Sequence, residues 1–276
     1  MELKVIENDG MTAVFEIKGT TPAFLNGLRR TLLSQVPKLA IDDVTIYDNT
    51  SALFDEMVSH RLGLLPVPTD LGLFVRRSEC TCNGEGCANC TVLFTLSKEG
   101  PAMVLSGDLV PAADQKFRIA DPKVPIVKLL EGQRVMLEAG AVLGSGIEHA
   151  KWQAVTAVGY THYPTAKVTG PLSAAAIERA QRTAPAGAVT FEGNNVRVVD
   201  PTKAAYFLKG IKEIFPDSPI EVGYEQDRFV FTVETDGSLT PVVALRKAVS
   251  ILMEKLKWVE ADAPKLEVYA PATPSV

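Results

Sequence analysis

All four cysteines of this 276-residue chain lie in one short stretch, CTCNGEGCANC, at residues 80–90. Their spacing, C-x-C-x4-C-x2-C, brings Cys80, Cys82, Cys87 and Cys90 within reach of a single ion. Thiolate sulfur is a preferred ligand of Zn²⁺, and four such ligands fill its tetrahedron and leave no position for water. The spacing therefore favours a structural zinc site over a catalytic one.

Two other uses of these thiols stay open at this point. Cys82, Cys87 and Cys90 match the C-x4-C-x2-C part of a plant-type iron–sulfur site, although no further cysteine follows them. The other alternative is that the thiols carry no metal or form disulfides. A zinc ribbon is disfavoured, because it pairs two C-x2-C knuckles across about 15–20 residues and this cluster is much more compact.

The rest of the sequence contains no recognisable catalytic constellation. Its three histidines are His60, His149 and His162, and none belongs to an H-E-x-x-H pair. Neither a G-x-S-x-G elbow nor a P-loop is present. The sequence thus predicts no catalytic residues and leaves two classes of function. One is a zinc-stabilised assembly protein, and the other is a stand-alone metal-binding or electron-transfer protein.

Composition narrows the possible partners and the location. With 46% apolar residues the chain can bury a sizeable core, and its net charge is −5. Such a charge supplies no overall basic field for a nucleic-acid backbone, so we expect no direct sequence-specific nucleic-acid contact. The start of the chain is too polar for a signal peptide, and there is no apolar run of about 18 residues, which predicts a cytoplasmic protein without membrane contact.

Local signals predict the elements that must position these residues. The Asn8-Asp9-Gly10 turn predicts a hairpin over residues 2–18. Thr21 and Thr240, each followed by proline, are typical N-caps and predict a helix up to Pro37 and a long last helix.

The residue pattern predicts strands and loops in the middle of the chain, and a mixture of helices and strands after it. The run KFRIA at residues 116–120 is one of the predicted strand segments. From residue 170 onward we expect a helix at 170–185, a hairpin around 193–195, a helix at 201–215 and a strand–turn–strand unit over 221–237.

Both predicted terminal helices carry apolar faces. The last helix repeats apolar residues at a 3-4-3-4 spacing, which is typical of a helix–helix seam. The alternative is an ordinary helix packed on its own sheet. The residues of the two faces are Phe24, Leu25, Leu28 and Leu32 in the first helix, with Arg29 and Arg30 beside them, and Val242, Leu245, Val249, Leu252 and Leu256 in the last.

Three stretches together resemble the family of archaeal RNA polymerase D subunits, related to the third-largest subunit of eukaryotic RNA polymerase II and to the bacterial alpha amino-terminal domain. They are FLNGLRRTLLSQVPKLAIDDVTI (24–46), DEMVSHRLGLLPV (55–67) and GIEHAKWQAV (146–155). The resemblance implies an α+β fold. It divides the chain into a discontinuous dimerisation domain (1–40 plus 224–262), a β-rich insert domain with the cysteine loop (41–166), a ferredoxin-like insert (167–223) and a flexible tail (263–276).

The family resemblance also implies a function. It is that of a non-catalytic assembly subunit of DNA-dependent RNA polymerase, which forms a heterodimer with the small subunit L. Together with subunits N and P, the pair makes the platform for the large catalytic subunits. By the same resemblance, a partner interface is expected at Phe24, Leu25, Leu28, Arg29, Arg30, Leu32, Asp55, Glu56, His60, Arg61, Leu245, Val249, Leu252 and Leu256.

Two qualifications accompany the resemblance. Internal ion pairing is the alternative role for Asp55, Glu56, His60 and Arg61. Many members of the family carry an iron–sulfur cluster in the ferredoxin-like insert, but residues 167–223 contain no cysteine here. Thiolates therefore cannot hold a cluster in this part of the chain.

Overall fold

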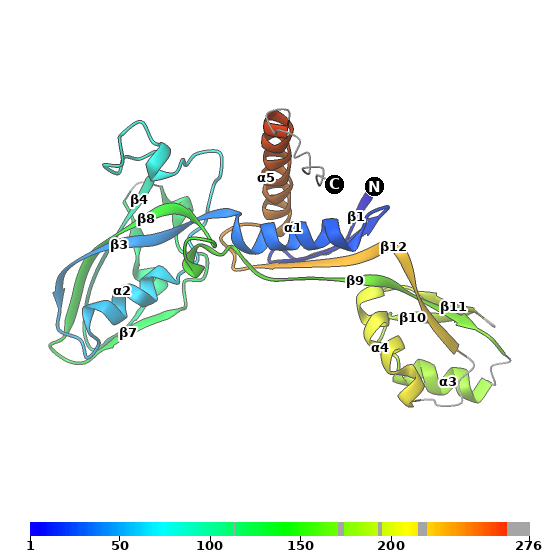
Figure 1. Ribbon diagram of the computed structural model, residues 1–276. Helices are drawn as coiled ribbons and strands as arrows, with labels where there is room; N and C mark the ends of the chain where they lie inside the picture. Colours follow the sequence, from blue (N-terminus) through cyan, green and yellow to red (C-terminus); the bar gives the residue numbers. More distant parts are fainter. Residues whose placement is uncertain (113, 171–173, 193–194, 215–219, 264–276) are drawn as a thin grey trace, which may run out of the picture. The chain divides into compact units, whose positions relative to one another are not determined.

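The computed structural model of the protein describes residues 1–112, 114–170, 174–192, 195–214 and 220–263. It confirms the α+β class (Figure 1). The chain divides into two compact units, Met1–Gly27 with Ala157–Glu234, and Leu28–Thr156 with the chain from Thr235 onward. The four-part division into domains given above stays a prediction. Its flexible tail falls on residues 264–276, which lie outside the described residues.

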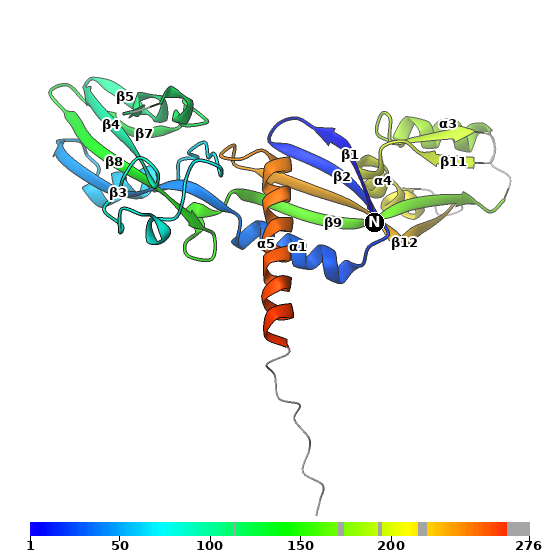
Figure 2. The ribbon, with the colours of Figure 1, turned by 90° about the horizontal axis from the view of Figure 1, so that it is seen from above.

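The first unit is built on a six-stranded sheet, and Figure 2 shows its first four strands side by side. Along the sheet the strands are β1 (Glu2–Asn8), β2 (Thr12–Lys18), β12 (Ile220–Thr235), β9 (Val155–Val168), β11 (Asn195–Val198) and β10 (Val189–Glu192). The predicted hairpin β1–β2 is confirmed. Its turn is held by Asp9, whose Oδ1 accepts the amide hydrogens of Met11 at 3.0 Å and Thr12 at 2.6 Å.

The predicted strand–turn–strand unit over residues 221–237 is wrong, because β12 is one continuous strand of 16 residues. The segment lacks glycine and proline between Gly223 and Gly237, so nothing there favours a turn. Arg228 instead pairs with Glu16 on the neighbouring strand at 2.8 Å and with Glu225 at 3.0 Å. Polar residues that resembled a turn therefore make contacts along and across an extended strand.

Between β9 and β12 the chain forms a small helical and β-rich module. It contains α3 (Ala174–Thr183), the β10–β11 pair and α4 (Pro201–Ile214). The tip of the predicted hairpin, residues 193–194, lies outside the described residues. This module has its own apolar core, made of Val196, Ala204, Phe207, Leu208, Ile211 and Ile220.

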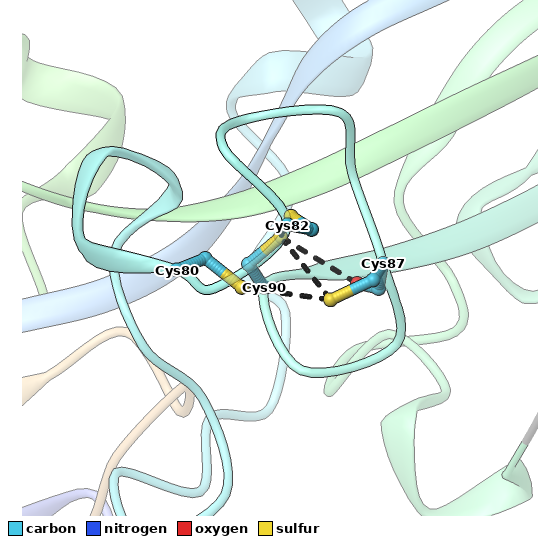
Figure 3. A group of neighbouring side chains, drawn as sticks. All are labelled: Cys80, Cys82, Cys87 and Cys90. Atoms are coloured by element: carbon cyan, nitrogen blue, oxygen red, sulfur yellow. Dashed lines mark hydrogen bonds between the residues drawn. The ribbon is translucent and has the colours of Figure 1, made fainter.

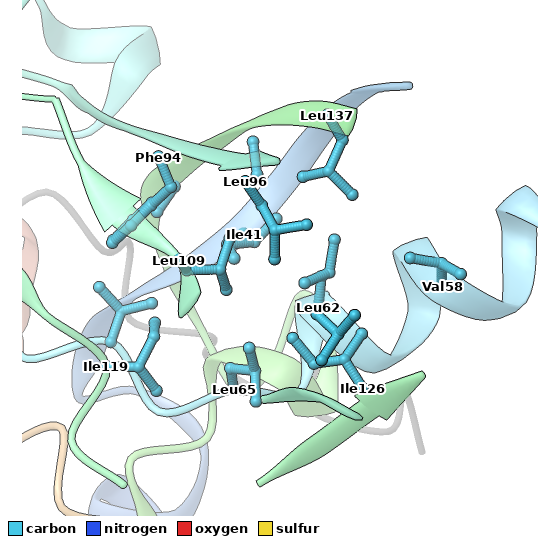
Figure 4. Close-up of a cluster of buried hydrophobic side chains, with 14 of the residues drawn as sticks. Ile41, Val58, Leu62, Leu65, Phe94, Leu96, Leu109, Ile119, Ile126 and Leu137 are labelled. Atoms are coloured by element: carbon cyan, nitrogen blue, oxygen red, sulfur yellow. The ribbon is translucent and has the colours of Figure 1, made fainter. Parts of the chain in front are cut away.

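The second unit contains a four-stranded sheet, a two-stranded sheet and α2 (Asp55–Gly63). The larger sheet has the order β3 (Pro37–Asn49), β8 (Arg134–Ser145), β4 (Thr91–Glu99) and β6 (Val110–Pro111), and the smaller one pairs β5 (Ala102–Leu105) with β7 (Pro125–Leu129). Side chains from both sheets and α2 share one apolar core (Figure 4). At one end of β3 the buried ammonium of Lys38 pairs with Asp236.

Four short 3-10 helices link these strands: η1 (Arg77–Glu79), η2 (Ser106–Asp108), η3 (Gln115–Phe117) and η4 (Ala150–Trp152). The predicted strand at 116–120 is therefore wrong. Asp114 caps η3 through a 2.9 Å bond from the Lys116 amide, which favours a turn at that point. Phe117 and Ile119 are buried, so their apolar character anchors a loop to the core.

Both predicted helix caps are confirmed. The Thr21 hydroxyl accepts the Phe24 amide at the start of α1 (Pro22–Ser34), and the Thr240 hydroxyl accepts the Val243 amide at the start of α5 (Pro241–Asp262), both at 3.4 Å. The buried residues of α5 all lie in its first half, and each described residue from Met253 onward is exposed. Among the described residues, no helix has both the length and the apolar character needed to cross a lipid bilayer.

Candidate metal centre and partner surface

The four cysteines converge on one point between η1 and β4 (Figure 3). Their Sγ atoms all lie within 4.8 Å of one another. The separations are 3.5 Å for Cys80 and Cys87, 3.7 Å for Cys82 and Cys90, and 4.0 Å for Cys87 and Cys90. None of these thiols forms a disulfide.

These separations fit a single tetrahedral ion. Zinc–sulfur bonds of about 2.3 Å place the sulfurs of a regular tetrahedron about 3.8 Å apart. Three of the six sulfur–sulfur separations, 3.5–4.0 Å, bracket that value, and all six lie within 4.8 Å. A cluster of several irons would bind its thiolates on different iron atoms and so spread them farther apart. The arrangement therefore suits one ion with a closed shell of sulfur ligands, which supplies cross-links rather than chemistry.

Tight turns bring the cysteines together. Asn83 and Glu85 donate their amide hydrogens to the carbonyls of Cys80 and Cys82, both at 3.1 Å. Asn83, Gly84 and Gly86 have φ angles of 53°, 87° and 91°, a region that suits glycine and tolerates asparagine. At the other end Cys90 is fully buried and directly precedes β4, so the β4–β8 register fixes its position.

Backbone amides already point at the sulfur atoms. The amides of Cys87 and Gly86 donate to the Cys82 sulfur and, with its thiol neighbours, lower the pKa of Cys82 to about 6. A hydrogen bond from the Cys82 backbone amide also favours a lower pKa for Cys80. Hydrogen bonds with the neighbouring thiols and burial outweigh this effect and raise the pKa of Cys80 to about 12. One member of the cluster thus ionises well before another. Amide hydrogens directed at sulfur stabilise thiolates, the form that binds metal.

Two arginines before the first cysteine tie the loop to the sheet. Arg76 pairs with Glu148 at 2.5 Å, and Glu148 also accepts the Ser145 amide at 2.8 Å. Arg77 pairs with Asp43 of β3 at 2.7 Å. Sequence reasoning missed both contacts, because no local pattern links residues 76 and 77 to positions tens of residues away.

The predicted interface residues fall into two groups in the structure. Leu25, Leu28 and Leu32 of α1 and Leu245 of α5 are buried within this chain. The remaining ones are exposed or half-buried: Phe24, Arg29, Arg30, Asp55, Glu56, His60, Arg61, Val249, Leu252 and Leu256. A partner could reach this second group directly. Their role in a partner contact stays a prediction.

The acidic and basic residues predicted on α2 also complement the helix dipole. Asp55 and Glu56 lie in its first turn, and His60 and Arg61 lie in its last. Asp55 accepts a hydrogen bond from the side-chain amide of Asn49 at 2.7 Å, and Arg61 donates to the Ile126 carbonyl at 2.6 Å.

The second half of α5 exposes a stripe of large apolar side chains. Val249, Met253, Leu256 and Val259 are 37%, 55%, 69% and 66% exposed, and they recur at helical spacing on one face. We call these four residues the α5 stripe. Met253 and Val259 extend the predicted seam and could have been found by following the helical period further along the helix.

The opposite face of α5 has a different character. Trp258, Lys247 and Glu254 of this face line a groove of about 470 Å³ together with Arg76 and Glu79. This groove is charged on both sides, whereas the α5 stripe is apolar. The two faces of the helix therefore suit different contacts.

Comparisons with known proteins identify the family. The RNA polymerase Rpb3/Rpb11 dimerisation domain matches residues 14–256. The DNA-directed RNA polymerase subunit Rpo3 of Thermoplasma volcanium is 37% identical over 92% of this chain and 96% of its own length. The subunits Rpo3 of Methanosphaera stadtmanae and Methanosarcina mazei are each 39% identical, over 92% and 87% of this chain and 96% and 90% of their own lengths. The chain therefore belongs to the RNA polymerase Rpb3/Rpb11 dimerisation-domain family, in company with archaeal Rpo3 subunits.

Proposed function

We propose that this protein is a non-catalytic assembly subunit of an archaeal DNA-directed RNA polymerase, and that it acts by forming a heterodimer with a small subunit. The observation that carries the proposal is the family match over residues 14–256, nearly the whole chain. Such a subunit works in the cytoplasm of an archaeal cell, and this is where we place the protein.

The α5 stripe is the surface that we assign to the small partner, subunit L. An exposed apolar stripe of this kind is unfavourable in water, and burial against a partner removes that cost. The exposed charged residues of α2 and the arginines of α1 lie outside this stripe and are available to the other subunits. We assign these contacts to the large catalytic subunits and to subunits N and P.

We further propose that the cysteine cluster holds a structural Zn²⁺. The support is the convergence of four sulfurs within 4.8 Å, three of whose separations match a tetrahedron, and the absence of an open ligand position when all four thiolates bind. In this site Cys80, Cys82, Cys87 and Cys90 are the ligands, and the metal cross-links η1, the loop and β4. A stable loop of this kind presents a fixed surface for assembly.

Affinity purification of the tagged chain from its native cells tests the assembly role. We expect the large polymerase subunits and one small subunit to accompany it. A Val249→Asp variant, which places a charge in the α5 stripe, is expected to lose the small subunit. The control is Lys255→Asp, which adds a carboxylate on the groove side of the same helix. Recovery of the chain alone, or with a reductase, would overturn the assembly role.

A further inference from the structure

A tetrathiolate zinc site carries excess negative charge. Four thiolates and one Zn²⁺ sum to a net charge of −2, and a charge of this kind is costly to shield from water unless a cation lies nearby. Two of the four ligands, Cys80 and Cys90, are buried. The inference below rests on the proposed zinc site and asks which residue of this chain offsets that charge.

Arg77 is the cation that the fold brings to the cluster. It begins η1, three residues before Cys80, and its Nη1 is fixed by Asp43 of β3 at 2.7 Å. Its guanidinium passes close over the loop, since a Cβ atom on Gly86 would lie 3.0 Å from Nη2. The same guanidinium interacts electrostatically with Cys90. Asp43 of β3 therefore fixes one end of the guanidinium, and the cysteine loop lies against the other.

One hydrogen-bond donor of Arg77, its buried Nε–H, has no acceptor among the residues that the structure describes. A buried donor without an acceptor costs free energy, and native folds usually provide it with a partner. A cysteine sulfur becomes a strong hydrogen-bond acceptor once metal binding ionises it to the thiolate.

We infer that Arg77 is a positioning residue of the metal centre, whose Nε–H donates to the Cys90 thiolate when Zn²⁺ is bound. Its positive charge then offsets part of the −2 charge of the site, and Asp43 holds the guanidinium in the required orientation. Groups of this kind, one step beyond the ligands, typically change metal affinity by about 10- to 100-fold when they are replaced.

Neighbouring Arg76 provides a matched control. Its side chain is 29% exposed, against 34% for Arg77, and it carries the same charge one residue earlier. It is directed to Glu148 instead of the cluster. A general effect of positive charge on the loop would therefore involve both arginines, whereas the inferred hydrogen bond involves Arg77 alone.

The test measures Zn²⁺ affinity of the full-length chain by competition with a chromogenic chelator. Arg77→Gln is expected to weaken binding about 10- to 100-fold and Arg77→Lys by less, because lysine keeps the charge without the Nε donor. Arg76→Gln is expected to change the affinity less than about threefold. Circular dichroism of the zinc-loaded variants checks that they are folded.

A second readout covers the case in which Arg77→Gln does not fold. Asp43→Asn leaves the arginine in place but releases its anchor, and it is expected to weaken binding severalfold and to shift the thiolate-to-metal charge-transfer band of the Co²⁺-loaded chain. Equal affinities for the wild type, Arg77→Gln and Asp43→Asn would overturn the inference, as would an equal loss in Arg76→Gln. A wild-type chain that binds no Zn²⁺ would instead overturn the metal site itself, and the inference with it.

Discussion

Truncation of Leu256 to alanine tests the α5 stripe quantitatively. Leu256 is 69% exposed in the isolated chain, so a partner that covers the stripe buries about two-thirds of its side chain. Complete burial of a leucine contributes roughly 1.5–3 kcal/mol, so the exposed part contributes roughly 1–2 kcal/mol. We therefore expect Leu256→Ala to raise the Kd of the heterodimer by roughly 5- to 30-fold.

Adding Met253→Ala should enlarge this effect. Met253 is 55% exposed, so its burial contributes roughly 0.8–1.6 kcal/mol by the same reasoning. If the two contributions add, the double variant binds roughly 20- to 450-fold more weakly than the wild type. Alanine is the best helix former, so α5 itself should not be weakened by these changes.

The assay is isothermal titration of the zinc-loaded chain with the purified small subunit. Glu254→Ala is the matched control, because Glu254 is exposed on the groove side of the same helix and alanine again removes most of the side chain. Its Kd should change less than about twofold, and the unfolding temperature of the free chain should stay the same in all variants. An unchanged Kd for the double variant would show that the α5 stripe is not covered by the small subunit.

Three further expectations concern ionisable groups. In the metal-free chain at pH 7, iodoacetamide should label Cys82 first, because its pKa is lowered to about 6, and peptide mass spectrometry identifies the site. Lys38→Ala should cost about 3 kcal/mol in urea unfolding, because it leaves Asp236 partly buried without its ion pair, whereas Lys38→Met with Asp236→Leu should recover much of the loss. Although burial raises the pKa of Asp108, a backbone amide and Lys98 outweigh it and lower that pKa. Because the pKa of Asp108 is lower in the folded state than the unfolded value of about 3.9, its ionised carboxylate stabilises the fold above that pH. This stabilisation is lost as the pH falls through the folded-state pKa, so Asp108→Asn should reduce the acid sensitivity of unfolding.

Local signals predicted the elements whose ends are set by single residues. Thr21 and Thr240 cap their helices as expected, and the Asp9 turn closes the first hairpin, because each effect acts within three or four residues. The predictions failed where burial or strand pairing with distant residues overrides local preference. The apolar residues Phe117 and Ile119 look like a strand but anchor a loop, and β12 continues through polar residues that resemble a turn.

Some features of the candidate site could be predicted from local spacing, and others depend on contacts between distant parts of the chain. Spacing alone identified all four cysteines as one group, because short turns keep nearby residues together. The cation beside them could not be predicted, since the contact between Arg77 and Asp43 depends on how η1 lies against β3. The spacing on α5 identified the apolar face but not the point at which burial gives way to exposure, which lies between Leu245 and Val249.

The route of the chain through the six-stranded sheet has an evolutionary consequence. The module with α3 and α4 is entered from β9 and left through β12, and these two strands are direct neighbours in the sheet. Adjacent strands lie only about 4.8 Å apart, a gap that a two-residue hairpin turn can close. Loss of the module would remove β11 and β10 from one edge of the sheet, and evolution could thus delete or replace it without changing the register of β1, β2, β12 and β9. Cysteines in such a module could be gained or lost on their own, independently of the loop that holds the four cysteines of this chain.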